Sequence, residues 1–294
     1  MEAVGKLGYR LNTVARGLRK GQTNTVALVV GDIKQGHFAE MTKSVQIALE
    51  SIGVELLLFN VGHSQQRFAQ FVLRASSMKL RAMTIAVSDA ISAPVADQLQ
   101  ALAAGGTPVI AISQNLTRLG IPSLVHEERA AVARSVEWLL QQGRRRIAYL
   151  GRIMHSAVSS ERYRGYKAAL VRAGHFDEAL VFDPAYRYVG GYETVCRALD
   201  AGLRFDAIQT ASDELAAGAI AALLDRKLAV PGDVAVIGIG NIEVSSYLRP
   251  ALTTWTSQHD TIANQLCAMI DGAAKGRADT LTLFPRELVR RESA

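Results

Sequence analysis

The chain has 294 residues, of which 49% are hydrophobic and 20% charged, and its formal net charge is +6. This length suits two domains of ordinary size, and this composition is typical of a globular protein rather than a disordered one. No run of 18 apolar residues is present, and Met1 is not followed by the basic and apolar regions of a signal peptide. The sequence therefore predicts a cytoplasmic protein without a membrane span.

The positive charge is concentrated at the start of the chain. The first 25 residues carry a net charge of +4, whereas the other 269 residues share +2. A basic terminal segment is usually a solvated tail, but it also suits DNA, because neutralising phosphates releases counterions. On charge alone both interpretations stay open.

Residues 24–118 alternate between short apolar runs and longer helical patterns. The runs are "TVALVVGD" (25–32), "VELLLFN" (54–60), "RAMTIAVS" (81–88) and "TPVIAIS" (107–113), and the helical patterns begin near Phe38, Gln65 and Ala93. Runs of this kind are typical of strands that are buried on both faces. They predict a lobe with a parallel sheet.

The same alternation begins again after residue 118. Helical patterns at 127–142, from about 160, at 190–201 and from 213 separate strand-like runs at 145–151, 179–183, 205–212 and 233–240. A strand-like run at 250–257, a helix at 260–275 and the segments "TLTLF" and "RELVRR" follow. The predicted fold class is α/β, with two similar parallel-sheet lobes, right-handed crossovers and several strands that join the lobes.

Domain boundaries follow from this alternation. We assign residues 1–23 to a separate N-terminal segment, 24–118 plus 257–284 to the first lobe, and 119–256 plus 285–294 to the second lobe. Two facing lobes of this type place a ligand in the cleft at the carboxyl ends of their strands. The segments that follow the predicted strands are rich in polar side chains and include a few aromatic rings, which suits a hydroxylated small molecule.

Other function classes find little support in the sequence. There is no GxSxG, HExxH or P-loop motif, and "VIGIGNIE" lacks the third glycine of a dinucleotide fingerprint. The six histidines form no cluster with ligand spacing, and Cys196 and Cys267 lie far apart in the sequence. We therefore predict neither an enzyme nor a metal or cofactor site.

Seven segments, in this order, carry a family resemblance: "LGYRLNTVARGLRKGQTNTVALVVGDI", "GRRRIAYLG", "SERYRGYKAAL", "FDAIQTASDELAAGAIAALL", "VPGDVAVIGIGN", "RPALTTW" and "LVRRESA". The chain resembles the LacI/GalR family of bacterial transcription regulators over residues 3–294. The resemblance implies a homodimer whose two-lobed core has the type I periplasmic-binding-protein fold. It also implies that a small effector, a sugar or a sugar acid, switches the affinity for operator DNA.

The resemblance assigns residues 11–21 to a hinge helix that forms on operator DNA. Its DNA-binding residues would be Asn12, Ala15, Arg16, Leu18 and Arg19, with Asn12 as the N-cap and Leu18 as a minor-groove wedge. So short a helix is marginal alone in water, so we expect disorder without DNA; a plain flexible linker is the alternative. Only the last piece of a helix-turn-helix fits before residue 11, so we expect this chain to bind its operator weakly or not at all, and the full-length protein to bind it.

The resemblance also implies a set of effector-binding residues: His37, Phe38, Ser88, Arg162, Tyr186, Ser212, Asp213 and Asn241. His37 and Phe38 would stack on a ring, and Arg162 would grip hydroxyls or a carboxylate. The alternatives are an exposed loop histidine at 37, a structural salt bridge at Arg162, and a helix cap at Asp213. Tyr188 could replace Tyr186 as the stacking ring.

One departure from the family pattern bears on the ligand. Many relatives have an aspartate at the position of Gly240 in "GIGN", where it accepts hydrogen bonds from the effector. Its loss, with Arg162 kept, favours an acidic ligand such as a sugar acid, unless Asn241 or Glu243 supplies the acceptor. The competing hypothesis is a periplasmic-type sugar-binding receptor of the same fold, and the basic hinge-like segment favours the regulator.

Overall fold

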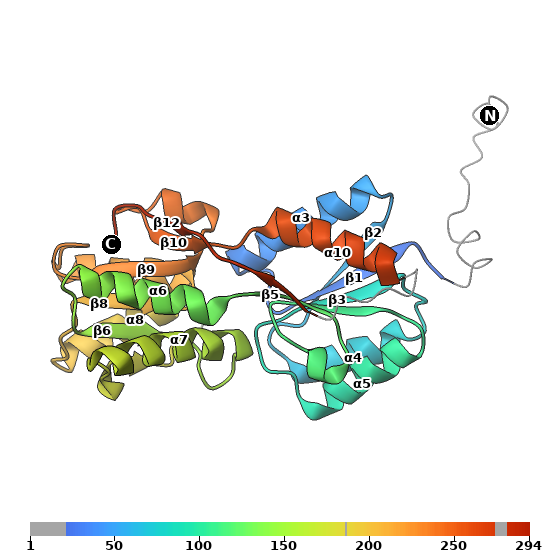
Figure 1. Cartoon of the computed structure of the whole chain (residues 1–294), viewed down its shortest axis with the longest axis horizontal. Coiled ribbons are helices and arrows are strands. Elements are labelled where there is room, and N and C mark those ends of the chain that lie inside the picture. Colours follow the sequence, from blue (N-terminus) through green and yellow to red (C-terminus); the bar gives the residue numbers. More distant parts are fainter. Residues whose placement is uncertain (1–21, 186, 274–280) are drawn as a thin grey trace, which may run out of the picture.

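The computed structural model describes residues 22–185, 187–273 and 281–294. These residues form two α/β lobes that lie side by side along the longest axis of the molecule (Figure 1). Each lobe has a six-stranded sheet, and nearly all neighbouring strands are parallel. The predicted fold class is confirmed. None of the helices in this described part of the chain is both long and apolar enough to cross a membrane.

The first lobe is built on a fully parallel sheet. Its strands are, in spatial order, β11 (Leu281–Phe284), β5 (Ser123–His126), β4 (Val109–Ile112), β3 (Ala82–Ala86), β1 (Thr25–Val30) and β2 (Glu55–Asn60). One face is covered by α3 (Gly36–Ser51) and α10 (His259–Ala273), and the other by α4 (Gln65–Ala75) and α5 (Ala93–Ala104).

The burial of β1 explains its unbroken apolar sequence. Val26, Leu28 and Val30 pack in the core under α3 and α10, whereas Ala27 and Val29 face α4 and α5. All five are fully buried. A strand that is covered on both faces has no solvent side on which polar residues could alternate.

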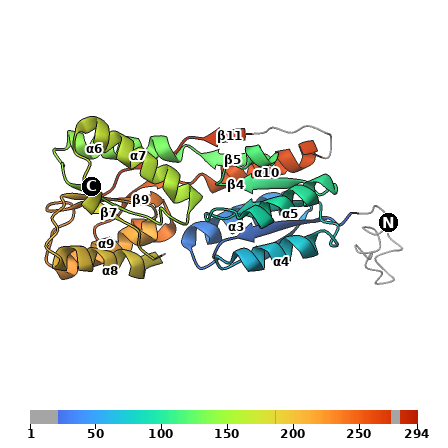
Figure 2. The same ribbon diagram turned by 90° about the horizontal axis from the view of Figure 1, so that it is seen from below.

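The second lobe repeats this architecture. Its strands are β12 (Leu288–Val289), β10 (Thr253–Thr256), β9 (Ala235–Gly240), β8 (Ala207–Thr210), β6 (Ile147–Leu150) and β7 (Val181–Phe182), with only the β10–β12 pair antiparallel. Figure 2 shows α6 (Glu128–Gln141) and α7 (Ala157–Ala173) on one side and α8 (Arg187–Asp200) and α9 (Asp213–Asp225) on the other. The described residues also form three short 3₁₀ turns, η1 (Thr117–Leu119) in the first lobe and η2 (Glu178–Leu180) and η3 (Glu243–Ser246) in the second.

The chain passes between the lobes at residues 126–128, 256–258 and 284–287, which we call the crossover segments. The first passage comes later than predicted, because β5 pairs with β4 and β11 in the first sheet. The first lobe thus extends past residue 118. The sequence of β5, "SLVH", is too short for its apolar pattern to predict a strand. Its neighbour β11 lies near the end of the chain, so no local pattern indicates their pairing either.

Helices α8 and α9 pack backbone against backbone. A Cβ atom at Gly218 would lie 2.0 Å from the Tyr188 carbonyl oxygen, and one at Gly191 would lie 2.1 Å from the Leu215 carbonyl oxygen. Neither position has room for a methyl group. The glycines therefore set the close approach of the helix pair that covers one face of the second sheet.

We expect Gly218→Ala to lower the free energy of unfolding by about 2 kcal/mol, because the methyl group forces α8 away from α9. This loss exceeds the roughly 1 kcal/mol by which alanine is favoured over glycine within a helix. Urea unfolding measures the change. Gly105→Ala is the control, since a Cβ there would only meet carbonyl oxygens of its own last helical turn at 3.3 and 3.4 Å; equal stability of the two variants would contradict the prediction.

Candidate functional site

A cavity lies between the lobes at the carboxyl ends of the parallel strands, where the sequence placed the ligand. Its volume is about 70 Å³ in this structure, below the roughly 300–1,000 Å³ of most ligand pockets. The polar and charged residues that line it are Gln35, His37, Ser88, Ser113, Arg152, Ser156, Ser159, Arg162, Arg187, Ser212, Asp213, Glu214 and Ser257. Both lobes and one crossover segment thus contribute to a single polar site.

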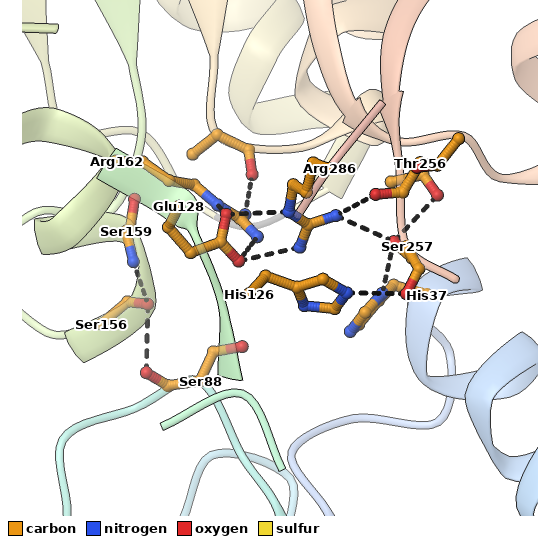
Figure 3. A network of polar contacts seen from close by, with 12 residues as sticks. His37, Ser88, His126, Glu128, Ser156, Ser159, Arg162, Thr256, Ser257 and Arg286 are labelled. Carbon is orange, nitrogen blue, oxygen red and sulfur yellow. Dashed lines mark hydrogen bonds and ion pairs between the residues drawn. The ribbon is translucent and has the colours of Figure 1, made fainter. Parts of the chain in front are cut away.

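Direct contacts between the lobes keep this cavity small. The amide of Gly36, at the start of α3, donates to Glu214 Oε1 at 3.0 Å, and the amide of Glu243 donates to Glu40 Oε1 at 2.9 Å. On the other side of the cleft, Ser156 Oγ donates to the Ser88 carbonyl at 3.1 Å (Figure 3). The described conformation is therefore closed, and a larger ligand requires these contacts to open.

Arg162 projects from α7 and is held by the protein on one edge. Its Nε and Nη2 donate to the two carboxylate oxygens of Glu128 at 2.8 and 2.7 Å, and its Nη1 donates to the Ala211 carbonyl (Figure 3). Burial raises the pKa of Glu128, but Arg162 and Arg286 outweigh this effect and hold it below its usual value. Arg162 thus lines the cavity and also forms the structural salt bridge that the sequence left as an alternative.

Of the two residues predicted to stack on a ligand ring, His37 faces the cavity and Phe38 does not. His37 lines the cavity, with its Nδ1 3.5 Å from Ser257 Oγ. Phe38, the next residue of α3, points into the hydrophobic core and is fully buried. It is absent from the cavity lining among the described residues. Successive helical residues point about 100° apart, so only one of these two neighbours can face the cleft.

Ser212 and Asp213, which the sequence analysis selected in the second lobe, both line the cavity and both also bind groups of the protein itself. Ser212 lines the cavity and caps α9 by accepting from the Leu215 amide at 3.3 Å. Asp213 lines it too, but its oxygens already accept from Thr254 Oγ1, the Ile242 amide and Ser245 Oγ at 2.5–2.9 Å.

Asn241 does not replace the acceptor that Gly240 lacks. Its Oδ1 accepts from Arg291 Nη2 at 2.7 Å, and the residue is not part of the described cavity lining. Glu243 is exposed and likewise does not line the cavity. Neither of the two substitutes considered from the sequence is therefore in place.

Glu214, which the sequence analysis did not select, brings a carboxylate into the cavity. Its Oε2 lies 3.4 Å from Nε of Arg187, a residue whose φ of 72° is unusual for a non-glycine. Burial raises the pKa of Glu214. The only sequence signal for it was its position directly after Ser212 and Asp213.

Several predicted residues lie outside the described part of the chain. These are Tyr186 and the hinge residues Asn12, Ala15, Arg16, Leu18 and Arg19. In the described part, no group of three or more histidine, cysteine or acidic side chains could hold a metal ion.

Three histidines gather at the crossover segments. The ring centroids of His37 and His259 are 4.8 Å apart, and a neutral His126 donates from Nε2 to the Ser257 carbonyl at 2.7 Å. Burial, with a further contribution from Arg286, lowers the pKa of His126 to about 3 and that of His259 to about 4. Burial also puts the pKa of His37 well below its usual value.

These histidines make stability depend on pH. The unfolded chain binds their protons below about pH 6.5 and the folded chain does not, so the free energy of unfolding falls as the pH drops from 7 towards 4. Each ring accounts for a loss of about 2 kcal/mol between pH 7 and pH 5. His126→Gln keeps a donor for the Ser257 carbonyl. We expect the free energy of unfolding of this variant to fall by about 2 kcal/mol less than that of the wild type between pH 7 and pH 5.

Urea unfolding of wild type and variant at pH 7 and pH 5 tests this. Burial raises the pKa of Asp213 and of Glu40, and these groups act in the opposite direction, but they are common to both proteins and cancel in the difference. His175→Gln, at an exposed histidine, is the control. An unchanged pH dependence in His126→Gln would contradict the prediction.

Comparison with known proteins gives a consistent picture. Residues 136–294 match a family profile described as a periplasmic binding protein-like domain. The HTH-type transcriptional regulator AscG of Escherichia coli is 30% identical over 299 aligned residues, which cover 99% of this chain and 87% of AscG. The HTH-type transcriptional regulator GalR of the same organism is 29% identical over 297, covering 99% and 84%.

Solved structures show the same likeness. The crystal structure of the Escherichia coli transcriptional repressor ascG has a TM-score of 0.79 at 26% identity and covers 92% of this chain and 99% of that chain. The lac repressor dimer bound to operator and the anti-inducer ONPF has a TM-score of 0.88 at 20% identity, covering 99% and 88%. The second likeness is one of fold.

Proposed function

Because this chain belongs to the LacI/GalR family of transcriptional regulators, we propose that its lobes form an effector-binding core and that the cavity between them binds a sugar acid. Binding of this effector would change the affinity of the protein for operator DNA. The relatives are transcriptional regulators and not enzymes. They support this function over a periplasmic-type sugar-binding receptor.

The observation that carries the proposal is that Arg162 lines the cavity with more N–H donors than its protein partners use. A guanidinium has five N–H donors, and three of those of Arg162 are used by Glu128 and Ala211. In the described part of the chain, one N–H on each terminal nitrogen has no partner. Such a pair suits the two oxygens of a carboxylate or two neighbouring hydroxyls.

The remainder of the cavity supports a hydroxylated and acidic ligand. Among the described residues, six serines line it, and a hydroxyl can both donate and accept, which matches the hydroxyls of a sugar. Three guanidiniums line it against two carboxylates. Asp213 already accepts from three internal donors and is 1% exposed, so Glu214 is the carboxylate more accessible to a ligand hydroxyl.

A thermal-shift series tests the ligand class. We expect one of D-gluconate, D-glucuronate or D-galacturonate to stabilise the protein, by about 2.7 kcal/mol at 100 times its dissociation constant. D-Glucose, D-galactose and glucose 6-phosphate are the comparison ligands. Arg162→Gln should weaken binding by roughly 10- to 100-fold, because a charged hydrogen bond is worth about 1.5–3 kcal/mol.

Arg164→Gln on the same helix is the matched control, since Arg164 is exposed. A response to neutral sugars alone would refute the acidic ligand and keep the sensor. Equal affinities of Arg162→Gln and Arg164→Gln would refute the assigned role of Arg162.

DNA contact is assigned to the segment before residue 22 on its sequence pattern. We propose that Asn12, Ala15, Arg16, Leu18 and Arg19 form the hinge that contacts operator DNA. The five positive charges of the first 25 residues support this assignment.

We further propose a homodimer that uses the outer face of α8. Tyr188, Val189 and Tyr192 on this helix are 37%, 56% and 36% exposed, although they are large apolar or aromatic residues. Exposed apolar clusters of this kind mark interaction surfaces. The lac repressor, which shares the fold, was solved as a dimer.

Val189→Asp should weaken the dimer by at least roughly 100-fold, because an unpaired buried carboxylate costs about 3 kcal/mol or more. Size-exclusion chromatography with light scattering measures the change. Val171→Asp is the matched control, since Val171 on α7 is also 56% exposed. If both variants stay dimeric, α8 is not the interface.

A further inference from the structure

Glu128 shares its carboxylate between two arginines from distant parts of the chain. It lies at the start of α6 and is the last residue of the first crossover segment, and its side chain is 4% exposed. Arg162 of the cavity donates to both oxygens, and so does Arg286, through Nη2 at 2.8 Å and Nε at 3.1 Å. We call these three residues the Glu128 triad (Figure 3).

Arg286 extends the triad to the other crossings. It lies between β11 and β12 in the third crossover segment, and its side chain is 1% exposed. Its Nη1 donates to the Thr256 carbonyl at 2.6 Å and to Ser257 Oγ at 3.2 Å, both in the second crossover segment. One buried carboxylate therefore connects the cavity arginine to all three crossover segments.

Such a cluster fixes geometry more than it adds stability. Apolar side chains of the same shape often stabilise a fold as well as a buried ion pair does, whereas loss of one partner leaves an uncompensated buried charge. The carboxylate can serve both guanidiniums only while α6, α7 and the third crossover segment keep their relative positions. Since α6 and α7 both belong to the second lobe, a rotation of the first lobe acts on the cluster through the third crossover segment, which leads from β11 of the first sheet to β12 of the second.

We propose that Glu128 and Arg286 are the positioning residues of the effector switch: they hold the unused N–H pair of Arg162 towards the cavity and set the closed angle of the lobes. A ligand that binds Arg162 then acts on the crossover segments through Glu128. The proposal rests on the proposed function only in taking the cavity as the effector site. It can be tested without an effector.

Three amides donate across the cleft and report whether it is closed. They belong to Gly36, Ala90 and Glu243, which donate to Glu214 Oε1, the His155 carbonyl and Glu40 Oε1. All are remote in sequence from Glu128 and Arg286. Their hydrogen–deuterium exchange, measured by mass spectrometry on the ligand-free chain, therefore follows cleft opening rather than local disruption at the triad.

Glu128→Asp keeps the charge but shortens the side chain, and Arg286→Met keeps the Glu128–Arg162 pair. In both variants we expect exchange at the three cleft amides and at the crossover segments to rise at least about tenfold. Exchange in the central strands β1 and β8 should rise far less. The matched control is Glu161→Gln, which breaks the exposed Arg129–Glu161 pair between the same helices α6 and α7.

The outcomes decide between positioning and simple stabilisation. Faster exchange at the cleft amides in both variants, with the control like wild type, supports the proposal. An equal rise at the cleft and in β1 and β8, or a rise confined to the crossover segments, overturns it. Because no effector is used, this result does not depend on whether the ligand is a sugar acid.

Discussion

The carboxylate of Glu128 is the constraint on which the joint between the lobes depends. It accepts hydrogen bonds from two guanidiniums, one from α7 and one from the third crossover segment, in a place almost closed to water. A buried charge destabilises the fold strongly when it loses an ion-pair partner. This ion cluster thus connects the three crossover segments, and Arg162 of the cluster lines the cavity.

The two sides of the cleft differ in how strongly they are fixed. Near the crossover segments, buried charges and neutral histidines fill the space, and moving them exposes unpaired groups. At the mouth, the lobes touch through single hydrogen bonds such as that from the Gly36 amide to Glu214. Each such hydrogen bond contributes only about 1 kcal/mol net, because water or a ligand can take the place of either partner. Opening at the mouth about a fixed rear edge follows from this difference.

The chemistry of the cavity depends on which polar groups the fold has already used. Asp213 carries a carboxylate to the cavity wall, but three internal donors occupy it. Arg162 is also engaged, yet the number of its N–H groups exceeds the number of its protein partners. Arg162 thus combines a fixed orientation with N–H groups that remain for a ligand, whereas Asp213 is 1% exposed and already accepts from three donors.

The sequence by itself determined the two lobes, the order of most strands and helices, and the approximate place of the cavity, because strands buried on both faces need continuous apolar runs and ligands gather where parallel strands end. Of the described effector-binding residues predicted from the sequence, five line the cavity: His37, Ser88, Arg162, Ser212 and Asp213. Only the tertiary structure decided that β5 belongs to the first sheet, that Phe38 points into the core and that Asn241 is bound by Arg291. It alone showed the pairing of Glu128 with Arg286, which lie 158 residues apart. Apolar periodicity is a local property of the chain, whereas the partner of a buried polar side chain is chosen by packing between segments that no local pattern relates.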